Sequence, residues 1–282
     1  MKKKGDLMIL KGKEVAKKIQ ESIAEVTQKE KIALAILAIG ENKSADAYIK
    51  GVLRTSEKLG VEVKLMRLPM DISTERVINH IEKINNDDSI NGLMIQMPLP
   101  KSLDQEKVIN AIDYRKDIDS MTDKNLGMVL KGKSNGLMPC TPVAVLETLD
   151  YYDIDVTGLD VTVIGRSNIV GKPVAALLTN RGATVTICHS RTKKLKEKTK
   201  SADLVIVAVG KKDFLSKDMV SEKSVVIDVG INVENGKLYG DADYDALKNY
   251  VKDITPVPGG VGSITNTLLI RNTVKAFRLS RR

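Results

Sequence analysis

Short apolar runs rich in Val, Ile and Leu alternate with helix-length amphipathic stretches along most of this chain. Continuous apolar runs separated by helices are typical of parallel strands that are covered on both faces. Amphipathic stretches at residues 74–85 and 170–181 are examples of the intervening helices. The strand candidates are residues 32–40, 61–68, 90–98, 160–165, 183–188, 202–210 and 224–230. The alternation predicts an α/β fold.

The segment KGKSNGLMPCTP, residues 131–142, is rich in Gly, Ser and Pro and divides the chain. Three strand–helix units precede it and a new series follows it, so we place a domain boundary near residue 138. The last stretch, TNTLLIRNTVKAFRLSRR, is an amphipathic helix that can return to pack on the first domain. The predicted domains are therefore residues 1–138 with 265–282, and residues 139–264.

Composition narrows the class of protein. Hydrophobic residues make up 42% and charged residues 29% of the 282 residues, which is typical of a soluble globular protein. The net charge of +9 is spread along the chain, as expected for a solvated surface or for attraction of anionic ligands. With 3% aromatic residues and no helix-turn-helix, zinc or RNP pattern, we expect no nucleic-acid partner.

Targeting and metal signals are also missing from the sequence. No apolar run is long enough for a signal peptide or a membrane span, so we expect a cytoplasmic protein without membrane contact. Cys140 and Cys188 have no CxxC spacing, which gives neither a zinc site nor a disulfide framework. With His80 and His189 as the only histidines, we expect no catalytic metal.

The stretch SADAYIKGVLRTSEKLG, residues 44–60, predicts a helix closed by a glycine. At about 100° per residue, its side chains divide into two stripes. Three cations share one stripe: Lys50, Arg54 and Lys58. The other stripe is uncharged: Tyr48, Val52, Thr55, Ser56 and Leu59. We therefore expect the face of the tyrosine to hold a partner rather than to transfer protons.

The stretch VTVIGRSNIVGKPVAALL predicts a buried strand, a turn opening at Gly165, and a helix with Gly171 near its start. Glycines that allow close approach, together with a helix N-terminus, favour a pyrophosphate, so we expect a dinucleotide site. The stretch matches neither standard motif, because Ser167 replaces a glycine of GxGxxG and Pro173 replaces the Ser or Thr of a Walker A loop. An ordinary strand–helix turn is the alternative.

The next strand ends in ICHSRT, with no acidic residue in the range 187–192. NAD sites usually place an Asp or Glu there for the ribose hydroxyls. Arg166, Ser190 and Arg191 instead offer donors that suit a 2′-phosphate, so we expect NADP rather than NAD. Solvation of surface arginines is the alternative.

Polar residues in the first domain mark a second candidate site. Gln96 lies inside the apolar run GLMIQMPLP, where a buried amide must find partners in the core or on a ligand. In KDIDS, residues 116–120, spacing alone predicts that Asp117 and Asp119 are surface residues.

Together these motifs resemble the methylenetetrahydrofolate dehydrogenase/cyclohydrolase family, the bifunctional FolD type. The resemblance runs through nearly the whole chain: Tyr48 with EKLG, GLMIQMPLP, KDID, PCTP, VIGRSNIVGKP, CHSRT, VVIDVGIN, YGDAD and TPVPGGVGSIT. It implies a folate-binding domain, a Rossmann-like NADP domain, and an active site in the cleft between them. It also implies a homodimer that acts on tetrahydrofolate derivatives in one-carbon metabolism and purine biosynthesis.

The resemblance assigns roles to residues of both domains. Tyr48 would stack beneath the aminobenzoate of the folate, Gln96 would bond near the reacting carbon, and Asp119 would hold the amino edge of the pterin. Further substrate contacts would be Val52, Pro98, Leu99, Pro258, Gly259 and Gly260. The cofactor contacts would be Gly165, Arg166, Ser167, Val170, Gly171, Ser190, Arg191, Gly230 and Ile231.

The chain departs from the family at one position that matters for catalysis. Bifunctional members have a catalytic lysine four residues after the tyrosine, where this chain has Val52; the downstream Glu57 and Gly60 fix the register. Milder departures from the usual residues are Ala45, Ser120, Ala144 and Ser263.

The two reactions of the family differ in what they require of position 52. Hydride transfer depends on alignment of two bound molecules, whereas hydrolysis of the methenyl group needs a positioned proton donor and acceptor. We therefore expect dehydrogenase activity, with cyclohydrolase activity weak or absent. The alternatives are a fully bifunctional enzyme and a folate- or nucleotide-binding protein that has lost catalysis.

Overall fold

The computed structural model describes residues 7–133 and 135–281, which form two compact units. The three-stranded unit comprises Lys18–Cys140 and Asn266–Arg282, and the six-stranded unit comprises Met1–Lys17 and Thr141–Thr265. In this division the described residues before Lys18 group with the six-stranded unit, whereas the sequence-based boundaries assign them to the other domain.

The three-stranded unit contains a parallel sheet of β2 (Ala33–Ile39), β3 (Glu62–Leu68) and β4 (Gly92–Ile95), in the order β3-β2-β4. Successive residues of a strand point to opposite faces. Ala35 and Leu37 of β2 pack with Val77 and Ile81 of α3 (Thr74–Asn85) on one face. The remaining helices are α1 (Gly12–Lys29), α2 (Lys43–Lys58), α4 (Gln105–Asn110), α5 (Asp123–Leu130) and α10 (Thr265–Ser280).

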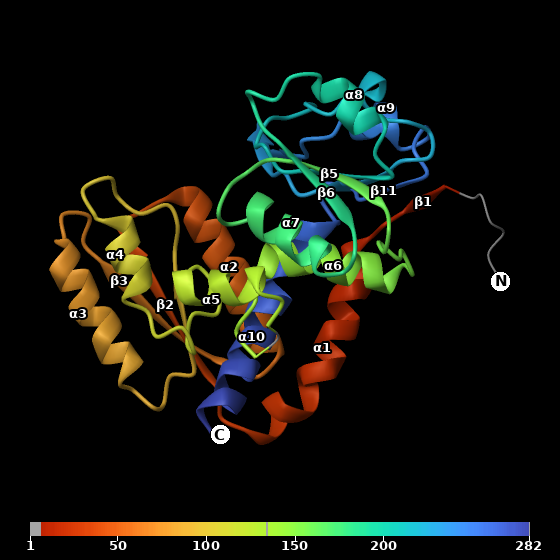
Figure 1. The fold of residues 1–282 in the computed structure, drawn as a ribbon. Coiled ribbons are helices and arrows are strands. Elements are labelled where there is room, and N and C mark those ends of the chain that lie inside the picture. The colour runs from red at the N-terminus through yellow and green to blue at the C-terminus, as the bar shows by residue number, and fades with distance from the viewer. Residues whose placement is uncertain (1–6, 134, 282) are drawn as a thin grey trace. The chain divides into compact units, whose positions relative to one another are not determined.

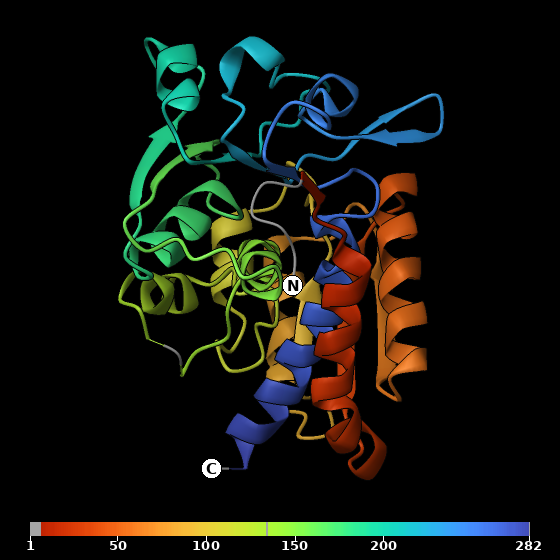
Figure 2. The same ribbon diagram turned by 90° about the vertical axis from the view of Figure 1, so that its right-hand side faces the viewer.

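The C-terminal helix α10 covers the other face of this sheet. A Cβ added to Gly92 of β4 would lie 3.3 Å from Thr273 of α10. Figure 2 shows α10 running beside α1, and Gln20 of α1 donates to Thr267 of α10 at 3.3 Å. The amphipathic C-terminal stretch thus packs within the unit formed by the first half of the chain.

The six-stranded unit contains a parallel sheet in the order β1-β11-β8-β7-β5-β6 (Figure 1). Its strands are β1 (Met8–Ile9), β5 (Asp160–Ile164), β6 (Thr184–Cys188), β7 (Leu204–Val207), β8 (Val225–Asp228) and β11 (Asp253–Ile254). Its helices are α6 (Cys140–Tyr151), α7 (Gly171–Thr179), α8 (Leu195–Lys200) and α9 (Tyr244–Leu247), with 3-10 turns at Lys217–Met219 and Val261–Ser263.

The chain leaves β5 for β6 on one side and then returns to β7 on the other side of β5. Open α/β sheets bind ligands at such a reversal, outside the carboxyl ends of the strands. A separate antiparallel hairpin of β9 (Asn232–Glu234) and β10 (Lys237–Tyr239) follows β8.

The predicted α/β class is confirmed, and each predicted apolar run contains one of the strands β2 to β8. The strands β1, β9, β10 and β11 were not predicted. They are two or three residues long, which is too short for a hydrophobic period to be read from the sequence.

Candidate active site

Helix α2 has the two faces that the sequence predicts. Val52 and Ser56 are fully buried, and Tyr48, one turn earlier, is half-buried. The cationic stripe lies on the exposed side of the helix: Lys50, Arg54 and Lys58. The side chain at position 52 is therefore part of the packed face and has no charged neighbour from its own helix on that face.

Gln96 and Asp119 come to the same edge of the three-stranded sheet. The segment that precedes Asp119 runs parallel to β4, since Leu93 bridges to Asp117. Two residues further along each segment are Ile95 and Asp119, so Gln96 and Asp119 both lie at the carboxyl end of β4. This is the edge at which parallel sheets place their ligand sites.

Asp117 is buried, contrary to the prediction from spacing. Its side chain is 1% exposed, and its carboxylate accepts hydrogen bonds from the amides of Met121 at 3.0 Å and Thr122 at 2.8 Å. Asn125 donates a third bond at 3.0 Å. Asp117 therefore fixes the loop that carries Asp119. The spacing of KDIDS gave no sign of this, because the donors arrive through a later turn.

Asp119 lies in a cluster with Tyr48 and Cys140, and it is only partly exposed, also contrary to the prediction. Burial raises the pKa of the Asp119 carboxyl to about 6, with a further contribution from the charge of Asp117. Burial, together with the nearby Asp119, raises the pKa of both the Tyr48 phenol and the Cys140 thiol. At neutral pH, Tyr48 and Cys140 are therefore uncharged and Asp119 is the group that titrates.

Gln96 has one engaged and one unengaged polar atom. Its Nε2 donates to the carbonyl oxygen of Met97 at 2.7 Å. Its Oε1 is buried and has no hydrogen-bond partner within the part of the chain that the structure describes. Buried polar atoms are rarely left without a partner, so an unpaired acceptor beside a sheet edge is typical of a ligand contact. Pro98 is exposed and Leu99 is buried directly after it.

The predicted substrate residues Pro258, Gly259 and Gly260 form a tight loop in the six-stranded unit. Gly259 has a φ of +103°, and its carbonyl oxygen accepts from the amide of Gly12 at 2.8 Å. Gly260 is buried, and an added Cβ would lie 2.5 Å from the carbonyl oxygen of Pro256. The backbone itself therefore requires these glycines, and the side chain of Pro258 is exposed.

The turn between β5 and α7 has the close approaches expected of a dinucleotide site. Gly165 has a φ of +131°, and a Cβ there would collide with the carbonyl oxygen of Ala208. A Cβ on Gly171 would collide with the carbonyl oxygen of Gly165. The hydroxyl of Ser167 accepts from the amides of Val170 at 3.1 Å and Gly171 at 3.4 Å. Ser167 thus orders the start of α7 in place of the missing glycine.

The residues predicted to bind a 2′-phosphate lie just after the ends of β5 and β6. These strands pair with Ile164 opposite Cys188, so Arg166 and the Ser190–Arg191 pair follow neighbouring strand ends. All three side chains are exposed, and the chain has no carboxylate from Ile187 to Thr192. The glycine cradle and this set of donors fit a dinucleotide with a phosphorylated ribose. Gly230 and Ile231 follow β8 at the same edge of the sheet.

Two residues with no assigned role also belong to this edge. Asp228 and Asp241 are buried carboxylates that bind backbone amides of the loops after β7 and β8. The motifs VVIDVG and YGDAD supported the resemblance, but nothing in them indicated that Asp228 and Asp241 lie close together.

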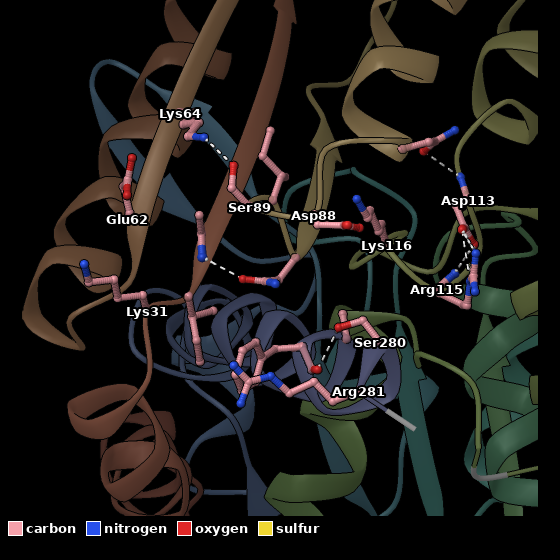
Figure 3. A pocket seen from close by; sticks show the side chains of 17 residues that line it. Lys31, Glu62, Lys64, Asp88, Ser89, Asp113, Arg115, Lys116, Ser280 and Arg281 are labelled. Carbon is pink, nitrogen blue, oxygen red and sulfur yellow. Dashed lines mark hydrogen bonds and ion pairs between the residues drawn. The ribbon is translucent and has the colours of Figure 1, made fainter.

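The cavity drawn in Figure 3 lies in the three-stranded unit, at the edge of its sheet opposite to Gln96. It is lined by the residues where β2 and β3 begin, the segment before β4, and the end of α10. Arg115 pairs there with Asp113, and Lys64 donates to Ser89 at 2.9 Å. Its residues lie at the amino ends of the strands, whereas Gln96 follows the carboxyl end of β4.

Comparison with known proteins identifies the family. Residues 10–119 match "Tetrahydrofolate dehydrogenase/cyclohydrolase, catalytic domain", and residues 139–281 match the NAD(P)-binding domain of the same family. The chain belongs to the tetrahydrofolate dehydrogenase/cyclohydrolase family. It is 44% identical over 277 residues to the "Bifunctional protein FolD" of Alkaliphilus oremlandii, covering 96% of this chain and 97% of that protein.

Solved structures of the tetrahydrofolate dehydrogenase/cyclohydrolase family have the same fold. The bifunctional FolD enzyme from Campylobacter jejuni is 38% identical, with a TM-score of 0.95 over 98% of this chain and 100% of that one. The FolD enzyme from Trypanosoma brucei, solved with NADP cofactor and an inhibitor, is 29% identical with a TM-score of 0.92, covering 98% of this chain and 99% of that one.

Within the described residues, no helix has the length and apolar character needed to cross a membrane.

Proposed function

We propose that this protein oxidises 5,10-methylenetetrahydrofolate to 5,10-methenyltetrahydrofolate with NADP, and that its cyclohydrolase activity is weak or absent. The observation that carries the proposal is the pairing of an intact Tyr48, Gln96 and Asp119 set with a fully buried valine at position 52. The first part follows the family, and the second part follows from the departure at Val52.

The dehydrogenase step makes modest demands on the protein. Bound NADP would supply the hydride acceptor, and the nitrogen lone pairs of the substrate stabilise the cation that develops at the one-carbon bridge. No protein group has to move a proton, and alignment alone contributes about 7–11 kcal/mol in favourable cases. Tyr48 would hold the folate by stacking, Asp119 would accept bonds from the pterin edge, and the unpaired Oε1 of Gln96 would complete the contacts.

The cofactor contacts would come from the six-stranded unit. Gly165 and Gly171 leave room for a pyrophosphate at the start of α7, and Arg166, Ser190 and Arg191 provide donors for the 2′-phosphate of NADP. An acidic residue in ICHSRT would repel that phosphate, and the sequence has none there. These features support NADP over NAD.

The cyclohydrolase step needs a proton carrier close to the bridge. Water adds to the methenyl cation and the ring then opens, which moves protons between oxygen and nitrogen; a positioned acid or base typically contributes about 10²–10⁴-fold. A valine has no group that binds a proton, and Lys50 and Arg54 lie on the exposed side of α2. Tyr48 and Cys140 have raised pKa values and stay protonated at neutral pH.

We further propose a cytoplasmic homodimer. The hairpin β9–β10 supports a contact between copies, because Val233 pairs with Leu238 across the strands, and both side chains, with Ile231, are exposed. An exposed apolar set of this kind on a small sheet is typical of a protein–protein contact.

Two assays on the purified protein test the proposed activity. NADPH formation from methylenetetrahydrofolate should be enzyme-dependent, and the decay of methenyltetrahydrofolate absorbance should not exceed the rate in buffer. Rapid enzyme-dependent decay would show a bifunctional enzyme and overturn the second half of the proposal. Absence of NADPH formation would leave a binding protein without catalysis and overturn the first half.

A further inference from the structure

Asp241 binds the loop that follows β7 through its backbone. Its Oδ2 accepts from the amides of Val209 at 2.6 Å and Gly210 at 2.9 Å, and its Oδ1 accepts from the amide of Lys211 at 2.8 Å. Asn232 donates a fourth bond to Oδ1 at 2.9 Å. The carboxylate is fully buried, and each oxygen is engaged twice. Three consecutive amides therefore converge on one side chain.

Asp228, the last residue of β8, holds Asp241 in turn. Its Oδ1 accepts from the amides of Gly230 at 2.9 Å and Asp241 at 3.0 Å, and its Oδ2 accepts from the amide of Ala242 at 2.8 Å. Its own amide donates to the hydroxyl of Thr255 at 2.7 Å. The two carboxylates thus connect three segments by hydrogen bonds. Asp228 at the end of β8 binds residues 241–242, and Asp241 binds the loop after β7.

Two glycines make room for these two carboxylates. A Cβ on Gly230 would collide with the carboxylate of Asp241, and a Cβ on Gly240 would collide with the carboxylate of Asp228. Each glycine lets the other segment approach within contact distance. Gly230 of VVIDVG therefore makes room for Asp241 of YGDAD, and Gly240 of YGDAD makes room for Asp228 of VVIDVG.

The loop held by Asp241 adjoins the dinucleotide turn. β5, β7 and β8 are parallel neighbours, with Ile164 opposite Val207 and Val207 opposite Asp228. The carbonyl oxygen of Ala208, the first residue after β7, occupies the space where Gly165 would otherwise have a Cβ. The loop 208–211 and the turn at Gly165 therefore share the edge of the sheet that we assign to the cofactor.

Burial of the two carboxylates costs free energy of folding. Burial and, to a smaller extent, the nearby Asp241 raise the pKa of the Asp228 carboxyl to about 6, although three backbone amides act to lower it. The two carboxylates are each less than 3% exposed, and they bind backbone amides rather than fill apolar space. Buried acids with perturbed pKa values cluster at functional sites.

We propose that Asp241 is a positioning residue for the cofactor: it fixes the loop 208–211 beside the dinucleotide turn, and Asp228 fixes Asp241. This inference deepens the proposed function and rests on NADP binding by the six-stranded unit. Both acids belong to the six-stranded unit, whereas the proposed folate residues Tyr48, Gln96 and Asp119 belong to the three-stranded unit. Loss of Asp241 should therefore weaken NADP binding and leave folate binding intact.

The variant Asp241→Asn keeps the size of the side chain but turns an NH₂ group toward backbone amides that need acceptors. We expect the dissociation constant for NADPH, measured by its own fluorescence, to rise 10- to 100-fold. The KM for NADP should rise with it, while the KM for methylenetetrahydrofolate stays within twofold. Asp228→Asn should act in the same direction, because it releases the amide of Asp241.

Asp243→Asn is the matched control. It makes the same change of charge two residues later, at a carboxylate that caps α9 through the amide of Ala246 and binds no residue of the loop 208–211. It should leave both constants within twofold. If Asp241→Asn does not fold, Asn232→Ala decides the question. It removes one of the four donors to Asp241, together with the bond from Asn232 to the carbonyl oxygen of Gly240, and should raise the NADPH constant three- to tenfold.

The outcomes separate the two proposals. A folded Asp241→Asn protein with unchanged NADPH affinity, or with equal losses for NADPH and folate, overturns the positioning role and leaves the proposed function standing. A wild-type protein that binds no NADPH overturns both.

Discussion

Val52 follows Tyr48 by one turn of α2 and is fully buried, whereas Tyr48 keeps part of its side chain exposed. The residue next to the proposed folate stacker is therefore an apolar packing residue. The exposed cations of α2 lie on the other side of the helix, so none of them replaces a proton carrier at this position. This relationship separates the two reactions of the family in a way that mutation can test.

Val52→Lys should raise cyclohydrolase activity about 10²-fold or more, because it places a protonatable group beside the proposed folate stacker, where the wild type has none on this face of α2. The measurement is the decay of methenyltetrahydrofolate absorbance, corrected for the rate in buffer. Dehydrogenase turnover should fall less than tenfold, since alignment by Tyr48, Gln96 and Asp119 is retained. The lysine should have a lowered pKa, because position 52 is buried.

Leu53→Lys is the control for this change. It adds the same charge to α2 about 100° further round the helix, and it should not increase hydrolysis. If Val52→Lys folds and still gives no hydrolysis above that of Leu53→Lys, the loss in this chain extends beyond one residue.

Asp119→Asn should stabilise the free protein at pH 7.5 and weaken folate binding. The folded-state pKa of about 6 lies above the ordinary value of 3.8, so protonation of Asp119 stabilises the fold below about pH 4, and this contribution is lost as the pH rises through 6. Asparagine resembles the protonated form, and a gain of about 1–2 kcal/mol is expected at pH 7.5 after allowance for partial exposure.

Denaturant unfolding at pH 7.5 and pH 4 measures this difference, which should vanish at the lower pH. Asp117→Asn is the contrasting variant, because Asp117 accepts three hydrogen bonds as a carboxylate. It should destabilise the protein by about 1–3 kcal/mol. Destabilisation by both variants at pH 7.5 would contradict the assigned roles.

Ser120 has a φ of +56°, in the left-handed region that favours glycine. A residue with a Cβ costs about 1–2 kcal/mol in this region, and the bond from the Ser120 hydroxyl to the carbonyl oxygen of Leu137 at 2.9 Å offsets part of that cost. Ser120→Ala should lower the free energy of unfolding by about 1–2 kcal/mol, because the strain stays and the bond is lost.

Ser120→Gly should remain within about 0.5 kcal/mol of the wild type, because it loses the bond but relieves the strain. Thermal or denaturant unfolding of both variants provides the comparison. Equal destabilisation by Ala and Gly would mean that the left-handed backbone carries no cost here.

Val233→Asp tests the proposed dimer contact. The side chain of Val233 is 64% exposed on the hairpin β9–β10, so a charge there should leave the fold of one copy intact. Sedimentation velocity should show a dimer for the wild type and a monomer for the variant. Lys237→Asp, at an exposed polar position of the same hairpin, should remain dimeric. A wild-type monomer, or a dimeric Val233→Asp protein, would exclude this contact.

The sequence predicted the features that depend on local periodicity or on backbone geometry. The runs that form β2, β4, β5, β7 and β8 are apolar because these strands are buried, whereas the edge strands β3 and β6 are largely exposed. Gly165 marks a turn that only glycine allows. Gln96 was informative because an amide in an apolar run must find a partner. Such signals lie within a few neighbouring residues.

The features that the sequence did not predict depend on distant residues. Asp117 is buried because the turn at Met121–Thr122 supplies its donors, and the carboxylate of Asp241 binds amides some 30 residues earlier in the chain. The burial of Asp228 likewise depends on residues 241–242. No local pattern distinguishes these acids from surface acids of the same spacing.

Arg191→Ala should shift cofactor preference from NADP toward NAD. Arg191 is exposed after β6, next to Ser190 and across from Arg166, so its guanidinium is free to bind the 2′-phosphate. A charge-assisted hydrogen bond of this kind contributes about 1.5–3 kcal/mol, which predicts a loss of about 10- to 100-fold in kcat/KM for NADP. The kcat/KM for NAD should stay within threefold, because NAD lacks the phosphate. Lys193→Ala removes the same charge two residues later and should change neither value. Equal losses with both cofactors would assign Arg191 to the shared part of the dinucleotide instead.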